Sequence, residues 1–404
     1  MSEQDELLKF LTASLKPHRR ADASIHIVFV LTGVVTAVLG PLIPLLVARR
    51  AVSSFQAGYL FSAQFLGSLA GVGLSSLLLA RFGFRRLLDG GLILMGAGVA
   101  ALWFCRWPVI LWCVASYGVG LGLVIPTSNL LVAESHWPRP APALNTLNFA
   151  WGLGAVVSSF LVGVFVATHA VGAGLAVLGL LMVALPTMAP LGVLPPKHEI
   201  VSGAASQQTS VKNKFITSAA ISLLFYLYVG TETSVGGWVA NYAKQMACKG
   251  HGSWILAPGF FWGGLLSGRA LAPTALKKIG DRTLMLVELP VAALGIALLL
   301  AAQSVGVIFG AAMVTGIGLA TVFPGTIALL SLHSGVAARR SGGLMFGLSA
   351  LGGASLPWLV GYVAAQSGEF RLGLTIPLAG ALAMWVVLIA IGRAPAAGTG
   401  GIPK

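Results

Sequence analysis

The side chains that could do chemistry in this sequence lie inside long apolar stretches. Glu232 is the acid that falls well inside such a stretch with no basic residue near it in the sequence, and Tyr228 precedes it by one helical turn. A charge in an apolar helix within a membrane is costly, so such a carboxyl is a functional candidate by default. Its chemistry would be to accept a hydrogen bond from a substrate or to carry a proton. A gating hydrogen bond and structural pairing are the alternatives.

Neutral amides, hydroxyls and aromatic rings make up most of the other buried polar groups. Amides and hydroxyls exchange hydrogen bonds with sugar hydroxyls in both directions, and aromatic faces can stack on the C–H face of a sugar. Besides Tyr228 and Glu232, the candidates for such a site are Thr36, Gln64, Asn129, Asn145, Asn148, Trp151, Trp262 and Trp358. Each has a plainer interpretation, either as a hydrogen bond between helices, as a hydroxyl bonded to its own backbone, or as a tryptophan of the interfacial belt.

Composition places these side chains in a membrane. Of 404 residues, 57% are hydrophobic and 9% are charged, whereas a soluble domain carries about 25% charged residues. A spanning helix needs about 20 mainly apolar residues. On that length the sequence predicts twelve spans, near 23–48, 55–80, 87–105, 108–134, 144–168, 171–190, 215–242, 254–273, 284–302, 305–331, 341–365 and 371–392.

The positions of the basic residues predict the orientation of these spans. The net charge of +14 would suit a nucleic-acid partner, but the Lys and Arg residues cluster in loops, so no nucleic acid is expected. With the N-terminus inside, most of them fall on the cytoplasmic side, as the positive-inside rule requires. The outer side receives Arg49, Arg50, Arg106, Lys244, Lys249 and Arg371. We therefore expect a multi-pass protein of the inner membrane with both termini in the cytoplasm.

The sequence lacks the residue patterns that are typical of secreted proteins, metalloproteins and enzymes. The polar first 21 residues lack the apolar core of a signal peptide. Three cysteines, Cys105, Cys113 and Cys248, have no metal-ligand spacing and are interpreted as packing residues, although the first two fall near the same outer loop. No nucleophile–base pair or phosphate-binding loop is recognisable, so we expect no enzyme activity, no metal and no cofactor.

The chain also repeats itself. At an offset of 198 residues, the segment 118–126 overlies 316–324, and Gly154 overlies Gly352. At an offset of 197, the Arg81 loop matches the Lys278 loop, and Gly33 overlies Gly230. Single glycine matches mean little in membrane helices, but a register held over two helices and their loop indicates duplication of a six-helix unit. The predicted layout is then a cytoplasmic segment 1–22, a bundle 23–190, a linker 191–214, a second bundle 215–392 and a cytoplasmic tail 393–404.

Two six-helix repeats and a basic central loop resemble the major facilitator superfamily. Residues 80–86, Ala-Arg-Phe-Gly-Phe-Arg-Arg, are similar to the signature of that family between spans 2 and 3, with Ala80 in place of the usual acid. The resemblance implies an all-α fold and a cytoplasmic ion-pair latch. Here that latch would use Arg81 or Arg85 with Glu134, at the inner end of span 4.

Within that superfamily, residues 144–154 and 226–238, together with Ser-Gly-Arg269, resemble the fucose/glucose-type sugar transporters. This implies a monomer that moves a monosaccharide, hexose preferred, through the lipid bilayer by alternating access. By the same alignment, the two positions that carry acids in the proton-coupled members are occupied by Gly40 and Ile125 in this chain. Uptake without proton coupling is therefore the favoured hypothesis. The glycines Gly236 and Gly237 would let span 7 bend, and Arg269 is assigned to gating with them. Glu288 is expected to pair with Arg269.

Three alternatives remain at this point. One is a proton-coupled sugar symporter, which would use Glu232. Another is a multidrug or amphiphile exporter of the same fold, although the stretch 154–159 lacks the proline of the exporters' motif. The third, a membrane receptor or scaffold, has almost no extramembrane domain with which to signal.

Overall fold

The computed structural model describes residues 23–50, 52–136, 141–188, 211–247, 252–334 and 338–393, and helices are the regular structure throughout these ranges. Every predicted span falls on helix, and the second and third spans share one long helix, so the all-α membrane fold is confirmed. The predicted cytoplasmic segment 1–22 lies outside the described residues, as do most of the linker 191–214 and all but the first residue of the predicted tail 393–404. The helix of the seventh span begins earlier than predicted, at Val211.

The N-terminal spans contain two sharp breaks. The helix Ala23–Ala37 and α2 (Leu39–Arg50) meet at 42°, because Pro41 has no amide to donate to the carbonyl of residue 37. Spans 2 and 3 form the single helix α3, Ser54–Leu102, which is interrupted at Gly83. There φ is 75°, a left-handed conformation that glycine adopts without a steric cost. This break lies in the loop predicted between the two spans.

The remaining helices follow the predicted order. They are α4 (Ile110–Ser135), α5 (Ala141–Ala167), α6 (Val171–Met188), α7 (Val211–Met246), the 3-10 turn η1 (Gly252–Leu256), α8 (Ala257–Leu276), α9 (Asp281–Ala301), α10 (Val305–Leu319), α11 (Val322–Ser334), α12 (Ala338–Ser367), α13 (Phe370–Gly373) and α14 (Thr375–Arg393). Within the described ranges, seven helices are long and apolar enough to cross a membrane, and the bent pair makes an eighth. Helix α7 is not among them, since polar side chains such as Glu232 lower its hydropathy.

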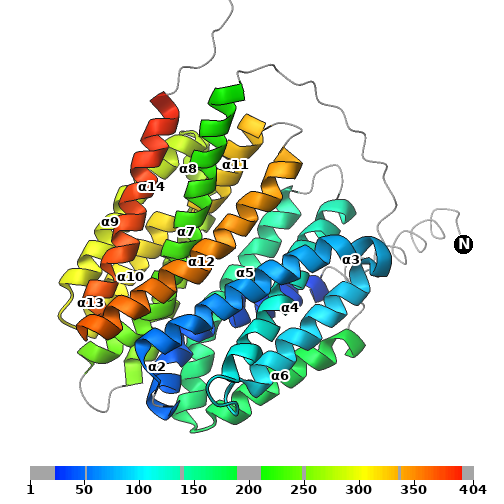
Figure 1. Ribbon diagram of the computed structural model, residues 1–404, viewed down its shortest axis with the longest axis vertical. Helices are drawn as coiled ribbons and strands as arrows, with labels where there is room; N and C mark the ends of the chain where they lie inside the picture. Colours follow the sequence, from blue (N-terminus) through cyan, green and yellow to red (C-terminus); the bar gives the residue numbers. More distant parts are fainter. Residues whose placement is uncertain are drawn as a thin grey trace, which may run out of the picture. The chain divides into compact units, whose positions relative to one another are not determined.

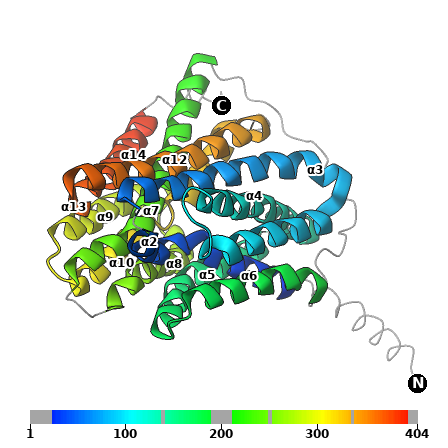
Figure 2. The same cartoon turned by 60° about the horizontal axis from the view of Figure 1, so that its bottom comes forward.

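The described chain divides into two compact units. The first contains the helix Ala23–Ala37, α3 from Ala63 onward, and α4 to α6. The second contains α7 to α14, with α12 and α14 both packed along α7 (Figure 1 and Figure 2). The hairpin Gly40–Ser62, which is α2 and the first two turns of α3, also belongs to the second unit although it precedes it in the sequence.

Glycines set the closest helix crossing of the first unit. A Cβ atom on Gly33 would lie 1.9 Å from the carbonyl oxygen of Trp151, and one on Gly154 would lie 1.9 Å from that of Val30. The helix Ala23–Ala37 and α5 are therefore in backbone contact, as small residues allow in membrane helices. Any side chain at either position would separate the two helices.

The second unit repeats this crossing at the equivalent positions. A Cβ atom on Gly352 would lie 2.0 Å from the carbonyl oxygen of Tyr226, and one on Gly230 would meet the side chain of Leu356 at 2.4 Å. Gly230 and Gly352 are the residues that overlie Gly33 and Gly154 in the sequence repeat. The same match holds between α4 and α10, where Gly120 and Gly318 abut the carbonyl oxygens of residues 91 and 288. Glycines at equivalent positions of the two repeats thus lie at close helix contacts in both units.

Candidate functional site

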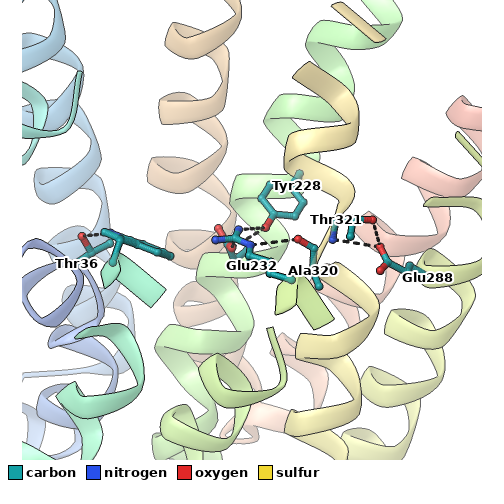
Figure 3. Close-up of polar contacts among 8 residues, drawn as sticks. Thr36, Tyr228, Glu232, Glu288, Ala320 and Thr321 are labelled. Carbon is teal, nitrogen blue, oxygen red and sulfur yellow. Dashed lines mark hydrogen bonds and ion pairs between the residues drawn. The ribbon is translucent and has the colours of Figure 1, made fainter. Parts of the chain in front are cut away.

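A cluster of polar side chains inside the second unit joins α7 to α8. The Tyr228 hydroxyl donates to Glu232 Oε1 at 2.7 Å, and Arg269 Nη2 lies 3.9 Å from the same oxygen. Arg269 Nη2 also donates to the Tyr228 hydroxyl at 3.4 Å. Tyr228 is 1% exposed and Glu232 is 9% exposed, and Figure 3 shows the two side chains facing each other. The carboxyl that looks isolated in the sequence is therefore paired with a guanidinium in space.

Arg269 also bonds to a broken helix. Its Nε donates to the carbonyl oxygen of Ala320 at 3.2 Å, in the gap between α10 and α11. In an unbroken helix this carbonyl would accept from the amide of residue 324, but residue 324 is proline and has none. A backbone oxygen left free inside a membrane needs another partner, and Arg269 provides it.

Glu288, which was expected to pair with Arg269, forms hydrogen bonds to Thr321. Glu288 Oε2 accepts hydrogen bonds from the Thr321 backbone amide at 3.1 Å and from the Thr321 hydroxyl (Figure 3). Arg269 forms an ion pair with Glu232, and a pair between Arg269 and Glu288 stays a prediction. The sequence missed Thr321 because a threonine in an apolar span usually bonds to its own backbone. Pro324 was the available signal, since it marks the break.

These charges are confined to the second repeat. At the offset of 197 residues, Glu232 overlies Val35, Arg269 overlies Val72 and Glu288 overlies Gly91. The helix crossings of the two units are nevertheless the same. The fold therefore does not require the three charges, whose burial is costly. A functional role for the cluster stays a prediction.

Gln64 is held between helices of the first unit. Its amide nitrogen donates to the carbonyl oxygen of Thr36 at 3.3 Å, and its oxygen accepts from the Tyr117 hydroxyl at 2.9 Å. The Trp151 indole donates to the Thr36 hydroxyl at 3.4 Å. Gln64 is 3% exposed, with both ends of its amide in use. This geometry favours the helix-contact interpretation of Gln64, and a substrate role for it stays a prediction.

The three asparagines are placed differently. Asn145 and Asn148 are exposed on the N-terminal half of α5, and Asn148 donates to the carbonyl of its own helix at Leu144, 2.8 Å away. Asn129 is half-buried and donates in the same way to Ile125. None of these bonds joins two helices. The amide oxygens are the groups that these residues could offer to a solute, and that role stays a prediction.

Trp262 and Trp358 belong to aromatic clusters. Trp262 is 6% exposed and packs edge-on against Phe261. Its indole also lies close to Gly236, where a Cβ atom would be 3.0 Å from it. Trp358 contacts Phe55 and Tyr59 of the hairpin Gly40–Ser62 and stacks on Tyr362. The structure thus links Trp358 to the hairpin, a contact that the sequence did not suggest.

The predicted gating residues also have close neighbours. On Gly237 a Cβ atom would lie 2.3 Å from the Phe61 ring of the hairpin. Close packing is therefore a sufficient reason for a glycine at this position, and bending of α7 is the other. Lys244, at the end of the same helix, donates to the carbonyl of Pro44 at 3.0 Å. In the first unit, Arg85 is exposed and lies 3.8 Å from Asp89 of its own helix. A latch between Glu134 and Arg81 or Arg85 stays a prediction.

Substitution of Gln64 by alanine distinguishes a helix contact from a substrate ligand. We expect Gln64→Ala to lower the free energy of unfolding by about 1–3 kcal/mol, because the buried Tyr117 hydroxyl loses its acceptor. Asn148→Ala is the matched control, since it removes only a bond within α5. Thermal unfolding of the purified variants measures the difference. Full stability of Gln64→Ala together with lost solute binding would instead identify Gln64 as a ligand.

Comparison with known proteins agrees with this architecture. The family model of the Major Facilitator Superfamily matches residues 25–342. A curated relative, the sodium-dependent glucose transporter 1 of Xenopus laevis, is 24% identical over 370 residues, which are 83% of this chain and 74% of the relative.

Two solved sugar transporters have the same fold at 16% sequence identity. The D-xylose-proton symporter superposes with a TM-score of 0.70, covering 91% of this chain and 97% of that one. The Escherichia coli fucose:proton symporter FucP has a TM-score of 0.59, covering 92% and 98%. At this identity the likeness concerns the fold alone.

Proposed function

We propose that this chain, which belongs to the Major Facilitator Superfamily, moves a neutral monosaccharide, preferably a hexose, across the inner membrane by alternating access. The observation that carries the substrate class is the match to a glucose transporter over 370 residues. The sequence supports the same class through amides, hydroxyls and aromatic rings inside its spans. The positive-inside pattern supports an orientation with both termini in the cytoplasm.

The charge balance of the α7–α8 cluster fits a neutral solute. Glu232 and Arg269 neutralise each other at 3.9 Å, so neither charge is left over for an ionic substrate. Tyr228 and Glu232 still offer a hydroxyl and carboxylate oxygens as hydrogen-bond partners. A sugar hydroxyl that donates to Glu232 would replace part of this network without leaving a buried charge unpaired.

We further propose that net uptake requires no proton gradient. The Glu232 carboxyl lies 3.9 Å from Arg269 and already accepts a hydrogen bond from Tyr228, and this geometry supports the role of a hydrogen-bond acceptor. The positions that hold acids in proton-coupled relatives are Gly40 and Ile125 in our alignment. Glu232 then serves as an acceptor for a substrate hydroxyl. The relative's name makes a sodium gradient the second driving force to examine.

Uptake of a radiolabelled sugar panel into proteoliposomes tests the proposal. We expect a hexose to enter down its own gradient and to reach the external concentration without an imposed proton or sodium gradient. Glu232→Gln should weaken apparent affinity by about 10-fold or more, since it loses a charged hydrogen bond. Downhill uptake and equilibrium exchange should respond alike to it.

The control and the contrary results are equally specific. Gln303→Glu adds a carboxyl at an exposed position between α9 and α10 that is not among the candidate site residues, and it should not add gradient dependence. Accumulation above the external concentration under a proton gradient, abolished by Glu232→Gln while exchange persists, would make Glu232 the proton carrier. Absence of sugar flux in a protein that exchanges an amphiphilic drug would favour the exporter alternative.

A further inference from the structure

Two cysteines lie side by side where the chain passes from α3 to α4. The Cys113 thiol donates to the sulfur of Cys105, with 3.2 Å between the two sulfur atoms. Both residues are half-buried and carry free thiols. A disulfide has a sulfur–sulfur distance of about 2.05 Å, so the two atoms need to approach by roughly another ångström. Side-chain rotation provides movements of that size.

The backbone around the pair is already fixed at close range. A Cβ atom on Gly98 of α3 would lie 2.5 Å from the carbonyl oxygen of Cys113 and 2.9 Å from the amide of Tyr117. Cys105 is held at the end of α3 by its amide, which donates to Ala101 at 3.1 Å. The first turns of α4 therefore rest on α3 without an intervening side chain, and a bond between the sulfurs needs no rearrangement of the helices.

The second repeat shows that packing alone does not require these sulfur atoms. Gly98 overlies Gly295 in the repeat. A Cβ atom on Gly295 would lie 2.5 Å from the backbone nitrogen of Thr315, a close contact of the same kind. At the offsets of 197 and 198 residues, Cys105 overlies Ala302 and Cys113 overlies Ala311. The same helix crossing thus forms with two buried alanines. What the first repeat gains from two cysteines is their chemistry.

We propose that Cys105 and Cys113 form a disulfide that ties the outer ends of α3 and α4 together. This goes beyond transport and rests only on the proposed orientation, which places the pair on the outer, oxidising side of the membrane. The oxidant is a disulfide of a small thiol or of a protein. One cysteine thiolate attacks it and releases one oxidant thiolate, and the second cysteine displaces the other. The two cysteine protons end on the two oxidant thiols.

Alkylation followed by intact mass measurement tests the pair. The full chain with Cys248→Ala has Cys105 and Cys113 as its two cysteines. Cells expressing it are lysed into denaturant with N-ethylmaleimide, with or without prior reduction. We expect no added maleimide without reduction and two after reduction. The variant with both Cys105→Ala and Cys248→Ala should take one maleimide or a reducible glutathione, and the alanines of the second repeat indicate that it folds.

A parallel arm treats the purified Cys248→Ala protein with oxidised glutathione. The proposal is supported if both thiols are lost to one intramolecular disulfide. The mass of the oxidised protein is then lower than that of the reduced protein by two hydrogen atoms. Two free thiols in cells, or two separate glutathione adducts in the purified protein, would overturn the proposal. In that case labelling of the cells with a membrane-impermeant maleimide shows whether the pair still faces outside. That result separates failure of the disulfide from failure of the orientation.

Discussion

Replacement of Arg269 by methionine is expected to abolish sugar uptake and to destabilise the protein. Arg269 Nη2 lies 3.9 Å from Glu232 Oε1, and Arg269 Nε also donates to the carbonyl of Ala320. Methionine leaves the carboxylate of Glu232 buried without its cation and the carbonyl of Ala320 without its donor. Removing one partner of a buried ion pair costs about 3–5 kcal/mol, and the side-chain exposure of 23% for Arg269 places the expected cost at the lower end.

The double variant Arg269→Met with Glu232→Gln separates charge from shape. Because it leaves no buried charge at this pair, it should regain most of the lost stability while uptake stays impaired. Thermal unfolding in detergent and uptake in proteoliposomes are measured on the unmodified protein, the two single variants and the double variant, which together form a double-mutant cycle. Additive losses in the double variant would show that the two side chains do not act as a pair, and the cluster would then lose its functional interpretation.

Substitution of the crossing glycines should have an effect of similar size on folding. Gly154→Ala and Gly352→Ala each place a Cβ atom within 2.0 Å of a backbone carbonyl oxygen on the neighbouring helix. Because backbone cannot rotate away as a side chain can, the helices must separate. We expect a loss of about 3 kcal/mol or more in the free energy of unfolding, seen as lower folded yield and a lower unfolding temperature.

Two other glycines serve as controls, because their substitution by alanine is expected to raise the stability rather than lower it. Gly73 in α3 and Gly263 in α8 have open space where a Cβ atom would lie. There alanine should be tolerated and should stabilise the helix by up to about 1 kcal/mol, because glycine is the weaker helix former. Equal destabilisation by all four substitutions would mean that the glycines act through helix flexibility rather than through close packing.

The sequence by itself determined the class of fold and the internal symmetry. An apolar run of sufficient length becomes a helix in a membrane because its backbone groups have no other partner, so the spans follow from composition. The repeat follows because Gly33 and Gly154 recur as Gly230 and Gly352, and close helix contact tolerates no larger residue there. The kind of side chain available for a solute was also predictable from polar residues in apolar stretches.

Only the tertiary structure decided which polar groups meet. Arg269 and Glu232 are on different helices, and their pairing depends on the crossing of α7 with α8 and on the carbonyl freed by Pro324. Likewise, Gln64 uses both ends of its amide between helices, which its spacing in the sequence does not reveal. Hydrogen bonds and ion pairs act over a few ångströms, whereas a sequence pattern specifies only the face of one helix on which a residue lies.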